Sequence, residues 1–523
     1  MSRITGFRTV KHSLASLLGR RYIRAVVAAQ TRLTGKSEPA LARIAEEEVD
    51  FLPANAQRKL VALLGQVGKD FSAPLGRSPS GAATLAWQAA SNQDLAPLAG
   101  WGCFRIGEGG RCYLTSKSEH YHTPLGHAFA GYQLLEHARK LGIPNATHNN
   151  TRGYIVRLLE EELIRTANGI ARADKSELKR AVRSRSGSVL NRVLNLQTGS
   201  LAAEAAVKLM LGRFHKARPG SDKPPYHGRV PVIVVIGDDD GQMTGNYHGT
   251  TVFAQMMRGM WPEVLSNLED RGAVKFVAVR PNRIEDVDRT FERYDSGKYK
   301  IAGFCHELVM MNYGARVLTK TYMRRCYRLC KAHDVPTFVD EIQSCLWSPQ
   351  LYMFREYGLR PTFAAIGKGF SGGEYAASRL LFNGRMDTLP QFGSLVTNGQ
   401  EELSALAYLI TMAWATKNRA VTRAVGDYYQ SKLTSLARRH GDLLSMVDGC
   451  RHMAGLCFRD LRTARSFVKL LSDRGVDISV QTYKASCPPT ALTKLPLIAG
   501  YEVVDFLLGR MDETLRYMRD GAK

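Results

Sequence analysis

The sequence predicts an α/β fold whose large domain is built on a mainly parallel sheet. Five short apolar runs each lead into glycine or a polar residue, as buried strands of such a sheet do. They span 230–236, 276–279, 301–305, 336–339 and 363–366. The amphipathic segment 321–335 between the third and fourth runs has the length of a helix, which is the order expected of a β-α-β unit. Because ligands bind at the carboxyl ends of parallel strands, the residues that follow these runs are the first candidates for a site.

Length, charge and cysteine usage set the class of protein. The chain has 523 residues, enough for two or three domains, and 44% of them are hydrophobic. Its formal net charge of +24 favours anionic partners, which include a phosphorylated cofactor, acidic substrates, nucleic acid and an anionic membrane surface. Nine cysteines, mostly in apolar segments, predict a reducing compartment, so we expect a cytoplasmic protein. No apolar run is long enough for a membrane span, and no residues stand at metal-ligand spacing.

The N-terminal third is expected to be basic at first, then helical, then a hairpin. Residues 1–37 contain eight arginines and lysines and no acid, and 14–30 predict a basic amphipathic helix. This extension suits a membrane-surface contact, a docking arm or a mitochondrial transit peptide, and an extension packed on the body is an equal alternative. From Ser37 to about Gly100 the pattern is helical, and 101–114 predict a β-hairpin around a glycine-rich turn.

A charged stretch covers residues 150–192. Arginine and lysine are dense within 172–188, as in a phosphate or nucleic-acid patch. Aromatic residues that would stack on bases do not interleave with them. A solvated helix followed by a loop is therefore the favoured interpretation.

Two strand ends carry the residues that predict chemistry. Asp340 follows the run 336–339, and Lys368 stands between two glycines after the run 363–366. Desolvation of a lysine there lowers its pKa toward the range in which the neutral amine attacks a carbonyl. Pyridoxal 5′-phosphate requires such an amine for its aldehyde and a carboxylate for its ring nitrogen. The pair thus predicts a site for that cofactor.

A phosphate cradle is predicted where a strand passes directly into a helix. Thr198, Gly199 and Ser200 follow an apolar strand end and open an alanine-rich helix. The first N–H groups of a helix have no partner within the helix and attract anions. These three residues therefore predict a phosphate cradle, with an ordinary helix start as the alternative interpretation.

In their order along the chain, these motifs resemble the class III (ω-aminotransferase-like) family of pyridoxal-phosphate enzymes of fold type I. The segment 340–343 (DEIQ) is similar to the family's DEVQ, and 367–373 (GKGFSGG) to its KGxxGG. The segments 198–208 and 247–249 (YHG) resemble the family's SGTEAxEAALK and YHG motifs, and 125–127 resemble the LGH step before its large domain.

The resemblance implies a role for each matched residue. Lys368 would carry the cofactor and, once released, move the Cα proton of the substrate, while Asp340 would hold the ring nitrogen. Gln343 would contact the 3′-oxygen. Tyr247 would cover the ring face, with His248 beside it. Glu307 matches the glutamate of EPVQG, and Thr397 matches the threonine of THGGNP, which reaches the cofactor phosphate of the other subunit. Residues 493–497 lie near the family's RxxPPL stretch.

The resemblance also implies the architecture. It predicts a large domain with a mainly parallel seven-stranded sheet, a small α/β domain built from both chain ends, and a homodimer. The expected division is 1–37 for the basic extension, 38–125 for the N-terminal part of the small domain, 126–399 for the large domain and 400–523 for the C-terminal part.

The expected activity is transfer of an amino group between an amine or amino acid and an oxo acid. The same cofactor contacts would serve an aminomutase, a decarboxylase or a racemase, because the orientation of the substrate over the ring selects the bond that breaks. A non-catalytic protein that binds nucleic acid or acidic partners through its basic surface is the alternative from another class.

Overall fold

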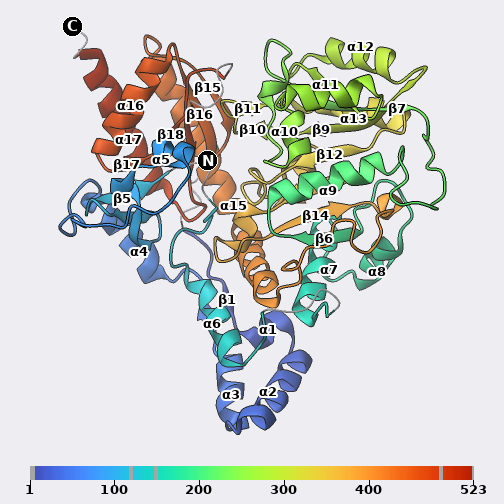
Figure 1. Ribbon diagram of the computed structural model, residues 1–523. Helices are drawn as coiled ribbons and strands as arrows, with labels where there is room; N and C mark the ends of the chain where they lie inside the picture. The colour runs from blue at the N-terminus through green and yellow to red at the C-terminus, as the bar shows by residue number, and fades with distance from the viewer. Residues whose placement is uncertain (1–5, 117–121, 146–150, 482–486, 521–523) are drawn as a thin grey trace.

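The computed structural model describes residues 6–116, 122–145, 151–481 and 487–520, and its centre is a seven-stranded sheet (Figure 1). In spatial order the strands are β6 (Arg192–Leu196), β14 (Ser378–Phe382), β13 (Phe363–Ile366), β12 (Thr337–Asp340), β9 (Tyr299–His306), β7 (Val230–Ile236) and β8 (Lys275–Val279). Strand β14 is antiparallel to both neighbours, and the other pairs are parallel. The predicted α/β class and the mainly parallel sheet of seven strands are confirmed.

Both faces of this sheet are buried, which explains why its strands are apolar throughout. In β7, Ile233 and Val235 enter the core on one face, and the alternate residues Val232 and Val234 enter the core on the other. The first face is covered by α9 (Gly199–Leu211), α10 (Val252–Met256) and α11 (Pro262–Asp270). The second is covered by α7 (Tyr154–Asn168), α12 (Ile284–Tyr294) and α13 (Lys320–Ala332), with α8 (Lys175–Arg183) packed on α7.

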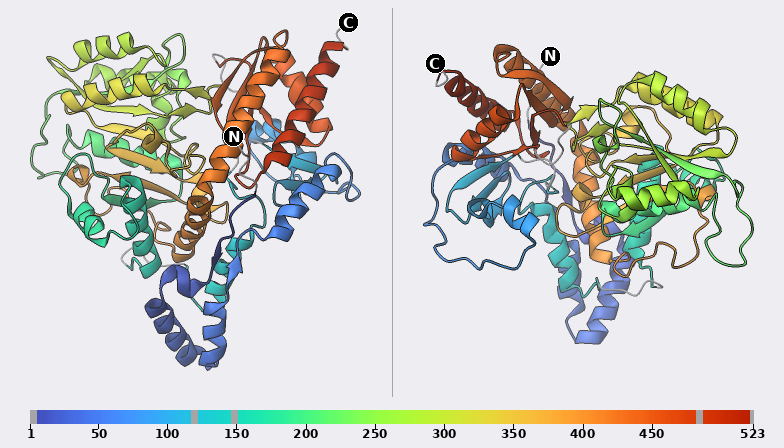
Figure 2. Two further views of the ribbon diagram at one scale, coloured as in Figure 1. Left: turned by 180° about the vertical axis from the view of Figure 1, so that it is seen from behind. Right: turned by 45° about the horizontal axis from the view of Figure 1, so that its top comes forward.

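Two smaller sheets lie beside the large one and combine segments from distant parts of the chain (Figure 2). One has the order β15 (Leu444–Cys450), β16 (Met453–Phe458), β19 (Thr490–Lys494) and β18 (Ser479–Val480). The other has the order β17 (Val476–Asp477), β5 (Cys112–Thr115), β4 (Phe104–Gly107) and β3 (Pro97–Trp101). Strand β17 pairs in parallel with β5, so both chain ends build this part of the fold. The exact domain boundaries stay a prediction.

A single long helix, α15 (Glu402–Arg439), runs between the large sheet and the smaller ones (Figure 1). It contacts α7 on one side and both β15 and α17 (Tyr501–Asp520) on the other. Trp414, Tyr408 and Tyr429 on this helix are fully buried. Helices α16 (Leu461–Asp473), α6 (Gln133–Lys140) and α14 (Met353–Glu356) complete the packing. Among the described residues, no helix combines the length and apolar character needed to cross a membrane.

One arginine joins the large sheet's loops to the C-terminal sheet. Arg316 begins the short strand β11 (Arg316–Val317), which pairs with β10 (Val309–Met310). Its Nη1 and Nη2 donate to the two carboxylate oxygens of Asp239 at 2.7 and 2.8 Å, and its Nε lies 3.2 Å from Oδ2 of Asp448 on β15. Asp239, in the acidic loop after β7, is thus part of an ion pair between sheets.

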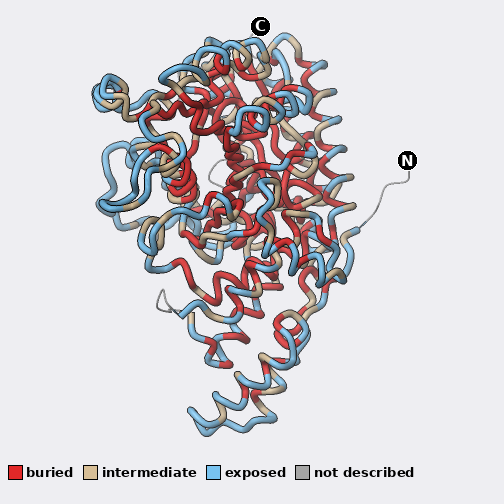
Figure 3. Tube along the Cα trace, turned by 90° about the vertical axis from the view of Figure 1, so that its right-hand side faces the viewer, coloured by how far each residue is buried: buried red, intermediate tan, exposed pale blue. Residues whose placement is uncertain are grey.

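The N-terminal region differs from the expected single basic helix. The basic helix is broken at Gly19 (φ 94°) into α1 (Leu14–Leu18) and α2 (Arg20–Thr34), because glycine accepts this backbone angle and other residues rarely do. Helix α2 packs on α3 (Glu38–Glu46), and the two project from the body, with a largely exposed surface (Figure 3). The strands β1 (Lys11–His12) and β2 (Val49–Asp50) pair at the base of this projection.

Residues 37–100 are less helical than expected, and the hairpin is larger. Only α3, α4 (Ala54–Ala62) and α5 (Leu85–Ala90) are α-helices, and the segment 72–84, with its prolines and glycines, is exposed and irregular. The predicted hairpin is present as β4 and β5. Strand β3 adds to it, and its first four residues are exposed. Its proline and glycine favour a turn over a strand in the sequence.

Candidate active site

The predicted acid, Asp340, ends β12 and is held by two hydrogen bonds. Its Oδ1 accepts the amide N–H of Ile342 at 3.0 Å, and its Oδ2 lies 3.0 Å from Nδ1 of His248. Because an ionised carboxylate only accepts, His248 Nδ1 carries the hydrogen of this bond. Both residues are buried, and Nε2 of His248 has no hydrogen-bond partner within the described residues. The carboxylate is therefore fixed in orientation at the carboxyl edge of the sheet.

The predicted phosphate cradle lies at the N-terminus of α9. Thr198 is the N-cap, and its Oγ1 accepts the N–H of Leu201 at 3.4 Å. The N–H groups of Gly199 and Ser200 have no acceptor within the part of the chain that the structure describes. Ser200 Oγ accepts the N–H of Thr250 at 3.0 Å, which ties the cradle to the loop that carries Tyr247 and His248.

Glycine is required on both sides of this contact. A Cβ on Gly199 would lie 2.7 Å from Cγ1 of Ile342, the residue whose N–H holds Asp340. Gly249 has φ 121°, and a Cβ on it would lie 2.6 Å from the Cα of Ser200. The cradle, the His248 loop and the Asp340 loop are therefore in direct contact.

The predicted lysine, Lys368, follows β13 in a tight turn with φ 40°. Such an angle is uncommon outside glycine and marks a site where the backbone is constrained. Gly367, just before it, packs against Ile342 and Ser378, and its carbonyl accepts a hydrogen bond from Cys345 Sγ at 3.4 Å. Lys368 is therefore positioned by the same loop that follows Asp340.

Gln343 makes a contact that sequence reasoning did not identify. Its Oε1 accepts a hydrogen bond from Nζ of Lys494, on β19, at 3.0 Å, and both residues are buried. The same Nζ lies 3.8 Å from the centre of the Trp347 ring. The only sequence signal is a lysine in the otherwise uncharged stretch 490–499, which the RxxPPL resemblance located without giving it a role.

Glu341, beside Asp340, points into a different environment. Its carboxylate accepts the N–H groups of Met353 and Phe354 at 2.8 and 2.6 Å, at the start of α14. Burial raises the pKa of Glu341 to about 7, although these two hydrogen bonds oppose the shift. The two adjacent acids therefore have separate functions, Asp340 at the site and Glu341 in anchoring α14.

Three other predicted residues are near the cluster or on the surface, with less defined contacts. Tyr247 is half-buried, and the guanidinium carbon of Arg258 lies over its ring, 5.1 Å from the ring centre. Glu307 is buried and directly follows β9, the neighbour of β12. Thr397 is exposed, in the segment between β14 and α15.

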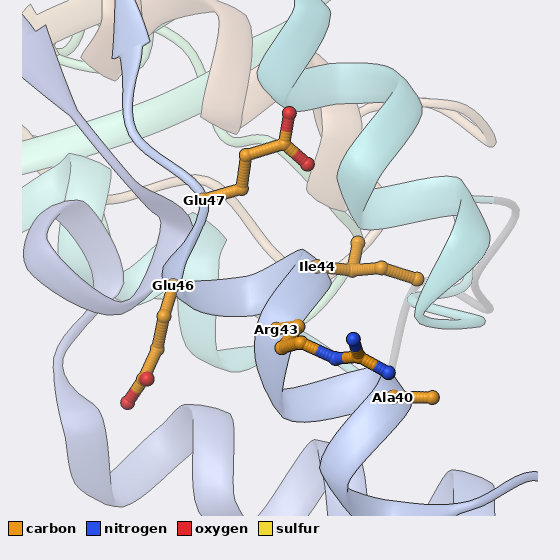
Figure 4. Close-up of a pocket in the computed structure, with 5 residues that line it drawn as sticks. All are labelled: Ala40, Arg43, Ile44, Glu46 and Glu47. Atoms are coloured by element: carbon orange, nitrogen blue, oxygen red, sulfur yellow. The ribbon is translucent and has the colours of Figure 1, made fainter.

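A surface hollow lies away from this cluster. It has a volume of about 530 Å³ and is lined by Ala40, Arg43, Ile44, Glu46 and Glu47 around the end of α3 (Figure 4). Arg43 and Ile44 lie near one another, whereas Glu46 points away from them (Figure 4). None of its residues belongs to the predicted site. The hollow is instead part of the projection formed by α2 and α3.

The residues at the sheet edge fit pyridoxal 5′-phosphate. Two amides at the start of a thirteen-residue helix suit its phosphate. A buried, oriented carboxylate suits its ring nitrogen, and a lysine one strand away suits its aldehyde. The buried, unpartnered Nε2 of His248 is a further polar atom at the same place.

Comparisons with known proteins agree with this fit. A family model described as "Aminotransferase class-III" matches residues 155–490. The chain is 23% identical over 331 residues to an ornithine aminotransferase of Schizosaccharomyces pombe, covering 60% of this chain and 70% of that protein. It is 22% identical over 313 residues to an L-lysine-epsilon aminotransferase of Streptomyces clavuligerus, covering 54% and 63%.

Solved structures show the same fold. The ornithine aminotransferase of Toxoplasma gondii ME49 superimposes with a TM-score of 0.63 at 16% identity, covering 82% of this chain and 91% of that one. An acetylornithine aminotransferase of Elizabethkingia anophelis gives a TM-score of 0.62 at 18% identity, with coverages of 82% and 95%.

Proposed function

The chain belongs to the class-III aminotransferase family, and from this membership we propose that the buried cluster around Lys368 and Asp340 is its active site. The protein is a pyridoxal-phosphate-dependent enzyme that transfers amino groups. The observation that carries the site assignment is the contact of three separate motifs. Gly199 packs on Ile342. The N–H of Ile342 donates a hydrogen bond to Asp340, and Asp340 is also hydrogen-bonded to His248.

Each residue of the cluster has a proposed binding role. The amides of Gly199 and Ser200, with Thr198 as the N-cap, hold the phosphate. Asp340, oriented by His248, holds the ring nitrogen protonated, and Gln343 contacts the 3′-oxygen. Tyr247 stacks on the ring, and Glu307 lies at the edge of the site. The bound cofactor supplies an electron sink that stabilises negative charge at the substrate Cα.

Lys368 is the proposed proton carrier. Once released from the cofactor, its amine would take the proton from the substrate Cα and hold it for the return step, which is general acid–base chemistry by one positioned group. The constrained turn at φ 40° fixes the direction in which the side chain starts. Burial of the surrounding strand ends excludes water from this transfer.

The substrates are an amino donor and an oxo acid. We propose that the donor carries its reacting amine at a chain end. Relatives named for ornithine, for the ε-amino group of lysine and for 4-aminobutyrate support this, since each compound has such an amine. Turnover with 4-aminobutyrate or ornithine, compared with alanine, measures this preference; faster turnover with alanine would contradict it.

Borohydride reduction is the experiment that tests the site. Borohydride reduces the carbon–nitrogen bond between a lysine and the aldehyde of pyridoxal phosphate, so the cofactor becomes covalently fixed. We expect the yellow protein to lose its colour and the label to lie on the peptide that contains Lys368. A colourless protein after incubation with pyridoxal phosphate, or a label on another lysine, would refute the assignment.

Replacement of Gly199 by valine is expected to weaken cofactor binding by about tenfold or more, because its side chain crowds Ile342 and blocks close approach of the phosphate. The dissociation constant of pyridoxal phosphate for the apoprotein measures the loss. Gly509→Val, on α17, is the matched control, since a Cβ there meets nothing within 4 Å. Equal affinity of the Gly199 variant and the wild type would place the phosphate elsewhere.

We propose a homodimer in which Thr397 of one subunit completes the site of the other. The exposure of Thr397 supports this arrangement.

A complementation experiment tests the shared site. Thr397→Asp should repel the phosphate, and Lys368→Ala should remove the amine, so each variant alone is expected to be nearly inactive. A hybrid dimer has one intact site, so co-expression should restore about a quarter of the activity by random assortment. No recovery, or sedimentation as a 58.0 kDa monomer, would contradict the proposal.

We propose a cytoplasmic location. The nine cysteines are all free in the structure and eight of them are buried, which supports a reducing compartment. Cell fractionation measures the location. Recovery of the protein in an oxidising compartment, with disulfides, would contradict it.

A further inference from the structure

A buried lysine outside the predicted motifs lies at the site. Lys494 is 0% exposed at the end of β19, with its Nζ between Oε1 of Gln343 and the ring of Trp347. A buried cation is costly unless specific contacts compensate for the loss of water. Such groups gather at functional sites, where they shift the charge balance.

Lys494 determines which way the amide of Gln343 faces. A lysine ammonium has three donors and no acceptor, so the Gln343 atom that faces it at 3.0 Å must be the oxygen. The oxygen and nitrogen of an amide are on opposite sides of its carbon. The NH2 group of Gln343 is therefore the end turned away from Lys494.

The positive charge of Lys494 acts on Cys345, which borders the turn that carries Lys368. Cys345 Sγ donates to the carbonyl of Gly367, and Trp347 would lie 3.0 Å from a Cβ on Gly369, so both residues border this turn. Burial raises the pKa of the Cys345 thiol to about 12, and the positive charge of Lys494 opposes that shift. Lys494 is thus electrostatically coupled to the immediate neighbours of Lys368.

We propose that Lys494 is a positioning residue for the cofactor, which fixes Gln343 with its NH2 group toward the 3′-oxygen of pyridoxal phosphate and adds one positive charge beside Lys368. The inference rests on the proposed role of Gln343 at the active site. Because Lys494 is on the C-terminal sheet and Gln343 follows the large one, the contact also makes cofactor binding depend on the packing of the two sheets. The bond from Trp347 Nε1 to the carbonyl of Leu495, at 2.9 Å, reinforces this contact.

The test compares Lys494→Met, Gln343→Leu and the double variant. Methionine keeps the apolar length and removes the charge. The dissociation constant of pyridoxal 5′-phosphate for the apoprotein should rise about tenfold in each single variant, the effect of one lost hydrogen bond to a charged group. The double variant should bind no more weakly than Gln343→Leu, because Lys494 acts through Gln343.

A spectroscopic readout separates positioning from simple stability. A nearby cation disfavours protonation of the nitrogen that joins Lys368 to the cofactor, so removal of the Lys494 charge should raise the pH midpoint of the visible absorbance. Among the described residues, the other ionisable groups around the site are Asp340, His248, Tyr247, Glu307 and Cys345, and none of them is changed in Lys494→Met. A purely structural lysine would not move this midpoint.

Lys300→Met is the matched control. Lys300 is also buried, but it pairs with Asp295 at 2.7 Å near the start of β9, at the opposite edge of the sheet. Its loss should lower the melting temperature and leave the cofactor's dissociation constant and absorbance midpoint unchanged.

Unchanged affinity and an unchanged midpoint in Lys494→Met would overturn the inference, and additive losses in the double variant would also overturn it. If Lys494→Met does not fold, Gln343→Glu is the deciding variant, because it keeps a partner for Lys494 but has no NH2 donor. It should bind the cofactor as weakly as Gln343→Leu does. Wild-type affinity of Gln343→Glu would overturn the inference. Borohydride labelling of the wild type on Lys368 distinguishes these failures from a failure of the proposed active site.

Discussion

Replacement of Lys368 by alanine is expected to lower turnover by about three orders of magnitude or more, because it removes both the amine that holds the cofactor and the group that moves the Cα proton. Lysine and alanine meet the same strain at φ 40°, so the substitution adds no backbone cost. The turnover number with an amino donor and oxo acid measures the loss, and the melting temperature of the apoprotein should stay near that of the wild type.

The matched control for this variant is Lys331→Ala. Lys331 is exposed in the last turn of α13, and its replacement should leave turnover unchanged. Turnover within tenfold of the wild type in Lys368→Ala, with cofactor still bound, would show that another group carries the chemistry.

Replacement of Asp340 by asparagine is the second large effect, an expected loss of about a hundredfold in turnover with the cofactor still bound. A neutral amide does not keep the ring nitrogen protonated, which weakens the electron sink. The amide oxygen also replaces only one of the two acceptors that now serve His248 and Ile342, so one of these hydrogen bonds is lost. Single-turnover rates and cofactor content, measured on the same preparation, separate the rate from the binding.

Asp295→Asn provides the control for loss of a buried aspartate as such. Asp295 also has a histidine partner, His333 at 2.8 Å, but it lies at the opposite edge of the sheet. This variant should lose stability and keep its turnover number. Equal turnover of Asp340→Asn and the wild type would show that the ring nitrogen has a different partner.

The large sheet could be predicted because its strands are buried on both faces. The runs 230–236 and 363–366 match β7 and β13 residue for residue, since nothing but apolar side chains fits between two helical layers. Asp340 and Lys368 could be predicted for the same reason, because a charged residue at the end of such a run must lie at the sheet edge.

Other features depend on contacts that the sequence does not display. Strand β3 contains a proline and a glycine, which favour a turn in the sequence, and the break at Gly19 depends on one backbone angle. The role of His248 becomes visible only when its ring meets Asp340, and that of Lys494 only when β19 is placed against Gln343. These are pairings between distant residues, for which spacing along the chain has no signal.

The pairing of β17 with β5 determines the order in which the chain can fold during synthesis. Leu114 is made early, but its partner Val476 leaves the ribosome only near the end of translation. At typical rates of synthesis the hairpin of β4 and β5 waits for its neighbour on the order of tens of seconds. During that time, side chains that are buried in the finished protein, such as Cys112 and Leu114, lack the strand that covers them. The large sheet is complete at β14, so all its strands have been synthesised before this last edge can close.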